Sequence, residues 1–252
     1  MIKSEAKRLF SRPMLYVAFI VGVFLINRPL IVDVLAKRTG PGSISQFLSV
    51  PFALSDFSPF AAIFCVLPYA DSFCEDYNTG YYRLTASRSG SSKYAFFRSA
   101  YVALSGGLVM AGIVLITILF CGSLANLPET PDRIEFMRHS IWVRSGIIYV
   151  MNGIPYLALR VVFGFLFGSV WSLIGLFIST ILTNKYVTYI APFVLYQMLW
   201  FVLSETKWNP VYQWRGDMEF IPSISFVLIY QTALIVILLT VSSLMIRRKV
   251  RS

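Results

Sequence analysis

Two ionisable residues of this sequence lie inside long apolar stretches, where charged side chains are rare and often have a function. They are Asp71 and Arg160. A charged group at the centre of a bilayer costs about 2.5–3.5 kcal/mol on insertion scales, so such residues often line the path of an ion or substrate. Alternatively, Arg160 can extend to the lipid headgroups, and Asp71 can be hydrated from one side. Both residues are therefore candidates for a translocation path.

The residue patterns that intramembrane enzymes need are missing from the sequence. A zinc protease needs H-E-x-x-H, and a serine hydrolase needs a histidine base, but the one histidine is His139, in a predicted outer loop. A paired-aspartate protease needs two membrane carboxylates, and Asp71 alone qualifies. Cys65, Cys74 and Cys121 lack the spacing of a zinc or disulfide framework and are expected to be buried apolar residues. We therefore expect no enzyme, no catalytic residue and no metal site.

The elements that hold these residues follow from the hydrophobicity of the chain. Of its 252 residues, 57% are hydrophobic and 13% are charged, and the mean hydropathy is +0.69. An average soluble domain is about half apolar and a quarter charged. Because a membrane helix takes roughly 20 apolar residues, we predict an all-α integral membrane protein with about six transmembrane helices in a single transmembrane domain. The predicted spans are 14–34, 57–77, 96–122, 157–183, 186–204 and 224–246.

The N-terminal part of the chain combines an amphipathic segment with an irregular first span. In residues 1–13, apolar and basic side chains occupy opposite faces of a helix, which predicts an interfacial helix on the inner leaflet. The alternative is a frayed basic tail that only sets the orientation. Asn27, Arg28 and Pro29 interrupt the first span, so we expect its helix to kink or to end there.

The distribution of cations predicts the orientation of the chain. Lys and Arg accumulate in short cytoplasmic loops. With the N-terminus inside, the inner segments carry the whole formal charge of +10, and the charges of the outer segments balance. Both termini are therefore predicted to be cytoplasmic, and the pI of about 9.7 needs no nucleic-acid partner. On the outer side, segments 131–156 and 208–222 are expected to be re-entrant or interfacial, or to form an ordinary aromatic belt.

Small residues recur along one face of the fourth predicted span. Their spacing of three or four positions lets a neighbouring helix approach closely, and in lipid such faces mark helix packing more often than a substrate groove. The predicted packing residues are Gly164, Gly168, Ser172, Gly175 and Ser179.

The segment 78–95, between the second and third spans, is predicted to be a short cytoplasmic helix that contacts another protein. Asp76 or Asn78 can cap such a helix, and Gly80 permits a sharp turn before it. Aromatic and aliphatic side chains beside arginines are typical of protein interfaces, although a solvated basic loop is the alternative. The predicted contact residues are Glu75, Asp76, Gly80, Tyr81, Tyr82, Arg83, Ser87 and Arg88.

In this segment the sequence resembles the permease subunits of bacterial type-2 ATP-binding-cassette exporters. In that family an acidic residue ending the second span, a nearby glycine and an Arg-Ser or Ser-Arg element form the coupling helix, which contacts the ATPase subunit. The whole plan is also similar: a basic amphipathic N-terminal helix, six spans, and irregular segments before the last span. The residues that match the family pattern are Glu75, Asp76, Gly80, Ser87, Arg88 and Tyr94.

This resemblance implies a subunit of the bacterial plasma membrane that pairs with a second, identical or related, permease subunit and with cytoplasmic ATPases. The substrate would be amphipathic, such as a peptide, an antibiotic or a lipid-linked molecule. No G-x-x-x-x-G-K-[ST] pattern occurs in the chain, so ATP and Mg²⁺ would be held by the partner and no cofactor by this chain. The alternatives are a membrane anchor or assembly subunit without transport activity and, with less support, an ion-coupled carrier.

Overall fold

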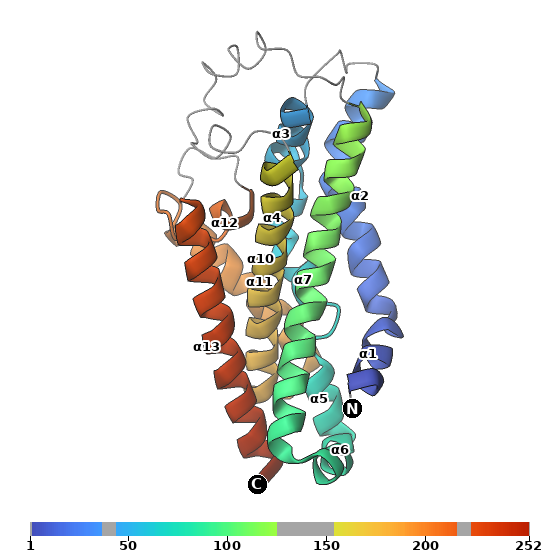
Figure 1. Ribbon diagram of the computed structural model, residues 1–252, viewed down its shortest axis with the longest axis vertical. Coiled ribbons are helices and arrows are strands. Elements are labelled where there is room, and N and C mark those ends of the chain that lie inside the picture. The colour runs from blue at the N-terminus through green and yellow to red at the C-terminus, as the bar shows by residue number, and fades with distance from the viewer. Residues whose placement is uncertain (1, 37–43, 125–153, 216–222, 252) are drawn as a thin grey trace.

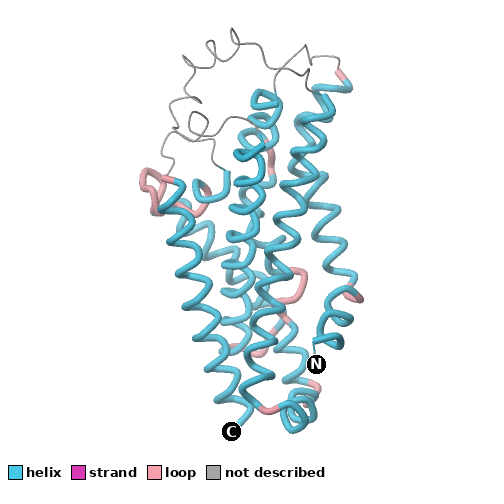
Figure 2. Tube along the Cα trace, in the orientation of Figure 1, coloured by secondary structure: helices cyan, strands magenta, loops and turns pink. Residues whose placement is uncertain are grey.

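The computed structural model describes residues 2–36, 44–124, 154–215 and 223–251, and every regular element within these ranges is a helix (Figures 1 and 2). The all-α prediction is therefore confirmed for the described residues. The helices are α1 (Ile2–Phe10), α2 (Pro13–Leu35), α3 (Ile44–Leu54), α4 (Phe57–Val66), α5 (Ser72–Asn78), α6 (Tyr81–Ser89), α7 (Ser91–Leu124), α10 (Ile154–Ile181), α11 (Lys185–Val202), α12 (Tyr212–Arg215) and α13 (Ile224–Arg251).

Four of these helices, α2, α7, α10 and α13, are long and apolar enough to cross a membrane. They occupy the predicted spans 14–34, 96–122, 157–183 and 224–246. A separate helix, α1, precedes the first span and ends at Phe10. Helix α2 begins at Pro13, a residue suited to the first turn of a helix. Pro29 lies within α2 and does not end it, so the expectation that the helix stops there is wrong.

The second predicted span, 57–77, is not one continuous helix. Helix α4 ends at Val66, residues 67–71 form turns, and α5 begins at Ser72. Pro68 accounts for the break, because proline has no N–H for the helical hydrogen bond and its ring crowds the carbonyl four residues earlier. The broken backbone is enclosed by protein, since Pro68, Tyr69 and Ala70 are buried, and non-helical backbone at membrane depth requires such cover.

The remaining helices differ from the predicted spans in length or in position. The fifth predicted span, 186–204, coincides with α11, which has 18 residues and is not one of the four long apolar helices. Helix α3 was not predicted, and its buried Phe47 and Phe52 join the core formed by α2 and α7. Helix α12 lies within the outer segment 208–222, whereas most of 131–156 falls outside the described residues.

The long helices form a bundle in which α7 and α10 lie side by side, with α2 and α13 to either side (Figure 1). Helix α1, helix α6 and the C-terminal end of α13 lie at the same end of this bundle. The C-terminal end of α7 and the N-terminal end of α10 lie at the other end (Figures 1 and 2). Helix α6 therefore lies at the end of the bundle where α1 lies and α13 ends.

The central pair of helices depends on glycine. A Cβ atom added at Gly106 in α7 would lie 2.6 Å from the backbone oxygens of Cys65 and Gly168. Backbone atoms cannot turn aside as a flexible side chain does, so only glycine allows this approach. Two residues of the predicted small face, Gly168 and Ser172, meet Gly106 directly, and Gly175 faces α4 instead.

We predict that Gly106→Ala lowers the stability of the protein by about 1–3 kcal/mol, the usual cost of overpacking. Gly122→Ala is the matched control, because Gly122 lies in the same helix and a Cβ there meets nothing within 4 Å. Both changes bring the same gain in helix propensity. The measurement is the thermal unfolding midpoint of the two purified variants in one detergent, and equal midpoints would contradict the close helix contact.

Candidate functional site

The predicted contact segment contains one short helix, α6, held between two glycine turns. Gly80, between α5 and α6, has φ 72°, and Gly90, between α6 and α7, has φ 83°. Both values lie in the left-handed region, which glycine adopts without strain. Gly80 occupies the N-cap position of α6 and no side chain caps that helix. The expectation that Asp76 or Asn78 caps it is therefore wrong, and both residues belong to α5.

Asp76 instead forms a buried ion pair with Arg98 of α7. The side chain of Asp76 is 1% exposed and that of Arg98 is 0% exposed. Arg98 donates a hydrogen bond to Asp76 Oδ2, and Tyr94, one turn earlier in α7, donates its hydroxyl to the same oxygen at 2.8 Å. A carboxylate and a guanidinium can be buried together only when their charges and hydrogen bonds compensate for the lost water. The pair therefore fixes α5 against α7.

Helix α1 enters the same cluster through Glu5. Glu5 Oε2 lies 3.0 Å from Arg98 Nη1 and accepts a hydrogen bond of 2.9 Å from the hydroxyl of Tyr69. Arg98 Nη1 also donates to the Tyr69 hydroxyl at 2.8 Å. Glu5 is buried, as are both of its partners. Arg98 thus contacts groups from α1, from the break between α4 and α5, and from α5 itself.

A second α1 residue, Arg8, contacts the other oxygen of Asp76. Arg8 Nη2 donates to Asp76 Oδ1 at 2.7 Å and lies 3.8 Å from Glu75 Oε2. Its guanidinium stacks on the ring of Tyr81, the first residue of α6, at 5.0 Å from the ring centroid. Burial disfavours the charge of Arg8, but the hydrogen bond and charge of Asp76 outweigh this effect, so the pKa of Arg8 is raised.

Arg12, the last residue before α2, pairs with Asp71 at the break between α4 and α5. Arg12 Nη1 donates to Asp71 Oδ1 at 2.5 Å, and Arg12 Nη2 donates to Glu75. Asp71 occupies the position before the first turn of α5 and also hydrogen-bonds Tyr189 of α11. The Asp71 charge is therefore balanced within the protein by a cation from the N-terminal region.

The structure separates the two residues considered for a translocation path. Arg160 is buried in α10, where it donates to the backbone carbonyl of Arg215 in α12 and stacks on Phe52 of α3 at 4.6 Å. Its partners belong to α3 and α12, at the opposite end from α6, whereas Asp71 belongs to the α1 and α5 cluster (Figure 1). The alternative in which Arg160 reaches the lipid headgroups does not agree with its burial.

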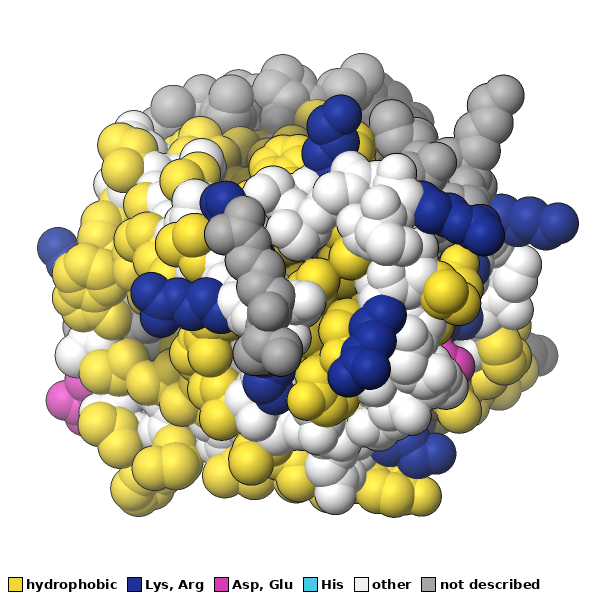
Figure 3. All heavy atoms as spheres, turned by 90° about the horizontal axis from the view of Figure 1, so that it is seen from below, with side chains coloured by type: hydrophobic (Ala, Val, Ile, Leu, Met, Phe, Trp, Pro, Cys, Tyr) yellow, Lys and Arg dark blue, Asp and Glu magenta, His cyan; other side chains and the backbone are white. Residues whose placement is uncertain are grey.

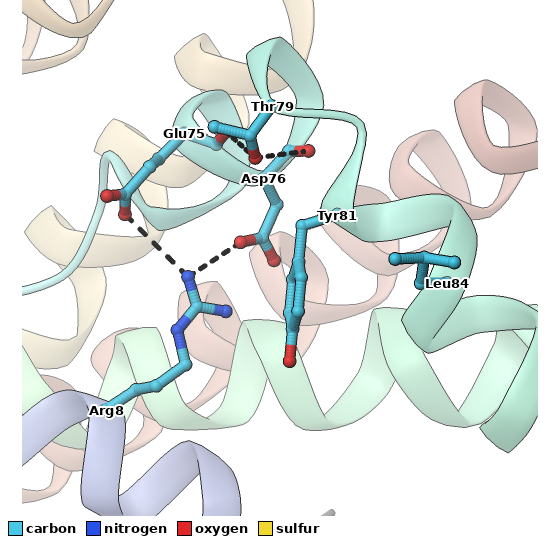
Figure 4. Close-up of a pocket in the computed structure, with 6 residues that line it drawn as sticks. All are labelled: Arg8, Glu75, Asp76, Thr79, Tyr81 and Leu84. Atoms are coloured by element: carbon cyan, nitrogen blue, oxygen red, sulfur yellow. Dashed lines mark hydrogen bonds and ion pairs between the residues drawn. The ribbon is translucent and has the colours of Figure 1, made fainter.

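The predicted contact residues of α6 divide into a buried side and an exposed side. Tyr82 is buried and stacks on Tyr77 of α5 at a ring distance of 5.2 Å, and Arg83 Nε donates to its hydroxyl at 3.0 Å. Tyr81, Arg83, Ser87 and Arg88 are exposed. Beside them opens a pocket of about 430 Å³ between α1, α5 and α6 (Figure 4). Its lining residues are Arg8, Glu75, Asp76, Thr79, Tyr81 and Leu84.

Sequence reasoning missed most of the cluster because it treated each cation as a topology signal. The N-terminal residues Glu5, Arg8 and Arg12 are spaced by three and four positions, as on one helical face, and Tyr94 and Arg98 are also four residues apart. This periodicity was the available signal, but the pairings of the N-terminal residues cross 59 to 93 positions of the sequence and depend on tertiary packing.

Comparison of the chain with protein-family models, with curated proteins and with solved structures finds no match. The function is therefore inferred from the geometry of the site. That geometry is a surface helix, α6, whose position is set by a buried charge cluster shared by α1, α5 and α7.

We predict that Arg98→Gln destabilises the protein by about 3–5 kcal/mol, because it leaves Asp76 and Glu5 buried without their cation. Arg28→Gln is the matched control, since Arg28 pairs with Asp56 where both side chains are exposed, and such pairs contribute about 0–1 kcal/mol. Thermal unfolding in one detergent compares the two variants. If they lose equal stability, Arg98 is not the centre of the cluster.

Proposed function

We propose that the chain is the transmembrane permease subunit of an ATP-binding-cassette exporter of the bacterial plasma membrane. The observation that carries this proposal is the coupling of an exposed helix to the bundle. Helix α6 presents side chains outward, and one glycine turn joins it to α5, whose Asp76 pairs with Arg98 of α7 and Arg8 of α1. Arg8 also stacks on Tyr81 of α6. A force applied to α6 is thus passed to the long helix α7 and to the N-terminal helix α1, as a coupling helix requires.

In this proposal the chain crosses the membrane six times with both termini in the cytoplasm. The crossings are α2, the broken pair α4 and α5, α7, α10, α11 and α13. The positions of α1, α6 and the end of α13 at one end of the bundle support an even number of crossings (Figure 1). At about 1.5 Å per residue, the 34 residues of α7 reach about 50 Å, so the helix extends beyond a hydrocarbon core of roughly 30 Å. Its first turns, with Tyr94 and Arg98, then lie near the cytoplasmic interface.

Two such subunits would assemble with two cytoplasmic ATPase subunits, which bind ATP and Mg²⁺ and supply the energy of transport. Movement of the ATPases displaces α6, and α5 moves with it because one glycine turn joins the two helices. The break at 67–71 allows α5 to tilt relative to α4. Access to the membrane interior then alternates between the two faces. The apolar and aromatic character of the helices favours an amphipathic substrate, with Asp71 and Arg160 near opposite ends of its path.

The orientation is tested by cysteine labelling in intact cells. We predict that Lys93→Cys reacts only with a membrane-permeant maleimide, whereas Asp56→Cys also reacts with an impermeant one, because both positions are exposed but lie at opposite ends of the bundle. The native Cys65, Cys74 and Cys121 are buried and give little background. Labelling of Lys93→Cys by the impermeant reagent would overturn the orientation.

The coupling role is tested on the complex purified from its own membranes. We predict that an ATPase with a nucleotide-binding loop copurifies with the chain. The Asp76→Asn variant should retain this ATPase, but its substrate-stimulated rate of ATP hydrolysis should fall about tenfold, because the link to Arg98 and Arg8 is weakened. Asp56→Asn, at an exposed carboxylate at the other end of the bundle, is the control and keeps the stimulation.

Absence of any ATPase from the purified complex would refute the exporter proposal. An ATPase that stays bound but never moves a substrate into or out of reconstituted vesicles would instead favour a non-transporting anchor. Stimulation that survives Asp76→Asn would remove the buried cluster from the coupling path.

A further inference from the structure

The exposed side of α6 has a chemistry that the coupling role alone does not specify. Tyr81 is 43% exposed and Leu84 is 62% exposed, although both are large apolar side chains outside any lipid-facing helix. With Arg88 they follow the i, i+3, i+7 spacing that places side chains on one helical face. Tyr82 and Ala86 cover the opposite face and are buried. Helix α6 thus has apolar side chains on two opposite faces: one face is buried in the core and the other is exposed.

The charge around this open side has a single sign. Arg83, Arg88 and Lys93 are exposed, and between residues 77 and 124 the sequence contains no Asp or Glu. None of these three cations forms an ion pair with a residue of the described ranges. Viewed from the α6 end, Lys and Arg side chains are spread over the face, and Asp and Glu side chains are visible only near its margins (Figure 3).

The pocket beside α6 supplies an apolar seat next to this basic surface. Tyr81 and Leu84 of α6 line the pocket, and Arg8, held by Asp76 and Glu75, lines it on the other side of the Tyr81 ring from Leu84 (Figure 4). Glu75, at the rim of the pocket, is 53% exposed, and its negative charge would repel a carboxylate of a partner on that side. A surface that fits this region therefore has its carboxylates over the arginines of α6 and an apolar side chain beside Tyr81.

The position of α6 favours a protein over a lipid surface as the occupant. Helix α6 packs on α5, α7 and α13 and covers the end of the bundle rather than its flank (Figure 1). Lipid would surround the flanks of the long helices, so the end of the bundle faces water. An anionic headgroup approaching the pocket would also meet Glu75, whereas a folded partner can place its charges to match each sign.

We propose that the exposed side of α6 binds an acidic groove of a cytoplasmic partner. The carboxylates of that groove face Arg83, Arg88 and Lys93, and one apolar side chain of the partner enters the pocket beside Tyr81 and Leu84. The identity of this partner as an ATPase rests on the proposed function. The charge and shape of its surface follow from α6 itself.

The experiment places a photo-crosslinking amino acid at Leu84 of the full-length chain in its native membranes and sequences the crosslinked peptide. The expected product joins Leu84 to a soluble protein within a stretch that carries several Asp or Glu residues and an apolar side chain. The same probe at Ile229, exposed near the start of α13 at the other end of the bundle, is the matched control and should not crosslink that protein.

A charge test follows on the purified complex of the two proteins. Arg83→Glu, Arg88→Glu and Lys93→Glu should each weaken binding about tenfold at low salt, with a smaller effect at high salt, because exposed charges are screened. Reversal of the partner carboxylates found by crosslinking should restore the affinity. Arg28→Glu, which lies far from α6, should leave the affinity unchanged.

The outcomes separate this inference from the exporter proposal. If the crosslinked protein is an ATPase, but the crosslinked surface has no carboxylates and charge reversal does not change its affinity, the acidic groove is refuted and the exporter proposal stands. An acidic partner that lacks a nucleotide-binding loop supports the groove and refutes the exporter. Crosslinks to lipid alone, or no crosslink from Leu84, overturn the groove.

Discussion

The Asp76–Arg98 ion pair is the constraint on which the α1 and α6 end of the molecule depends. Neither side chain has access to water, so separating the two charges would leave each buried and uncompensated. Asp76 also binds Arg8, and Arg98 also contacts Glu5. Helices α1, α5 and α7 therefore share one electrostatic centre, and none of them can shift alone without breaking a buried contact.

The rest of the bundle combines stiff and yielding regions around this centre. Helices α7 and α10 touch through backbone at Gly106, which leaves no room for sliding without loss of contact. The segment that contains α4 and α5 is instead interrupted at 67–71, where Pro68 prevents a continuous helix. The cluster is thus attached to a rigid pair of helices on one side and to a broken helix on the other. A change in the angle between α4 and α5 can therefore take place at the break only if the helices of the cluster move together.

The sequence was informative about elements and uninformative about their pairing. Runs of apolar residues located α2, α7, α10 and α13, because hydrophobic length alone decides where a spanning helix can form. The break after Val66 was missed because Pro68 lies within an apolar run that hydropathy treats as continuous. Among the site residues, Asp76 and Tyr94 were singled out for other roles, while Glu5, Arg98 and Tyr69 were not. Their meeting depends on how α1 packs against α7, and no local pattern encodes that packing.

The two glycines that flank α6 have a consequence for how this surface can diversify. Each junction contains one glycine with positive φ, so α6 has a fixed length of 9 residues between two rigid corners. One inserted or deleted residue would rotate the downstream helix face by about 100° and turn the open side toward the core. Evolutionary change in this region is thereby restricted to side-chain replacement at constant length. If the helix came to bind a different protein, the exposed residues of α6 would be substituted while the length from Gly80 to Gly90 stayed the same.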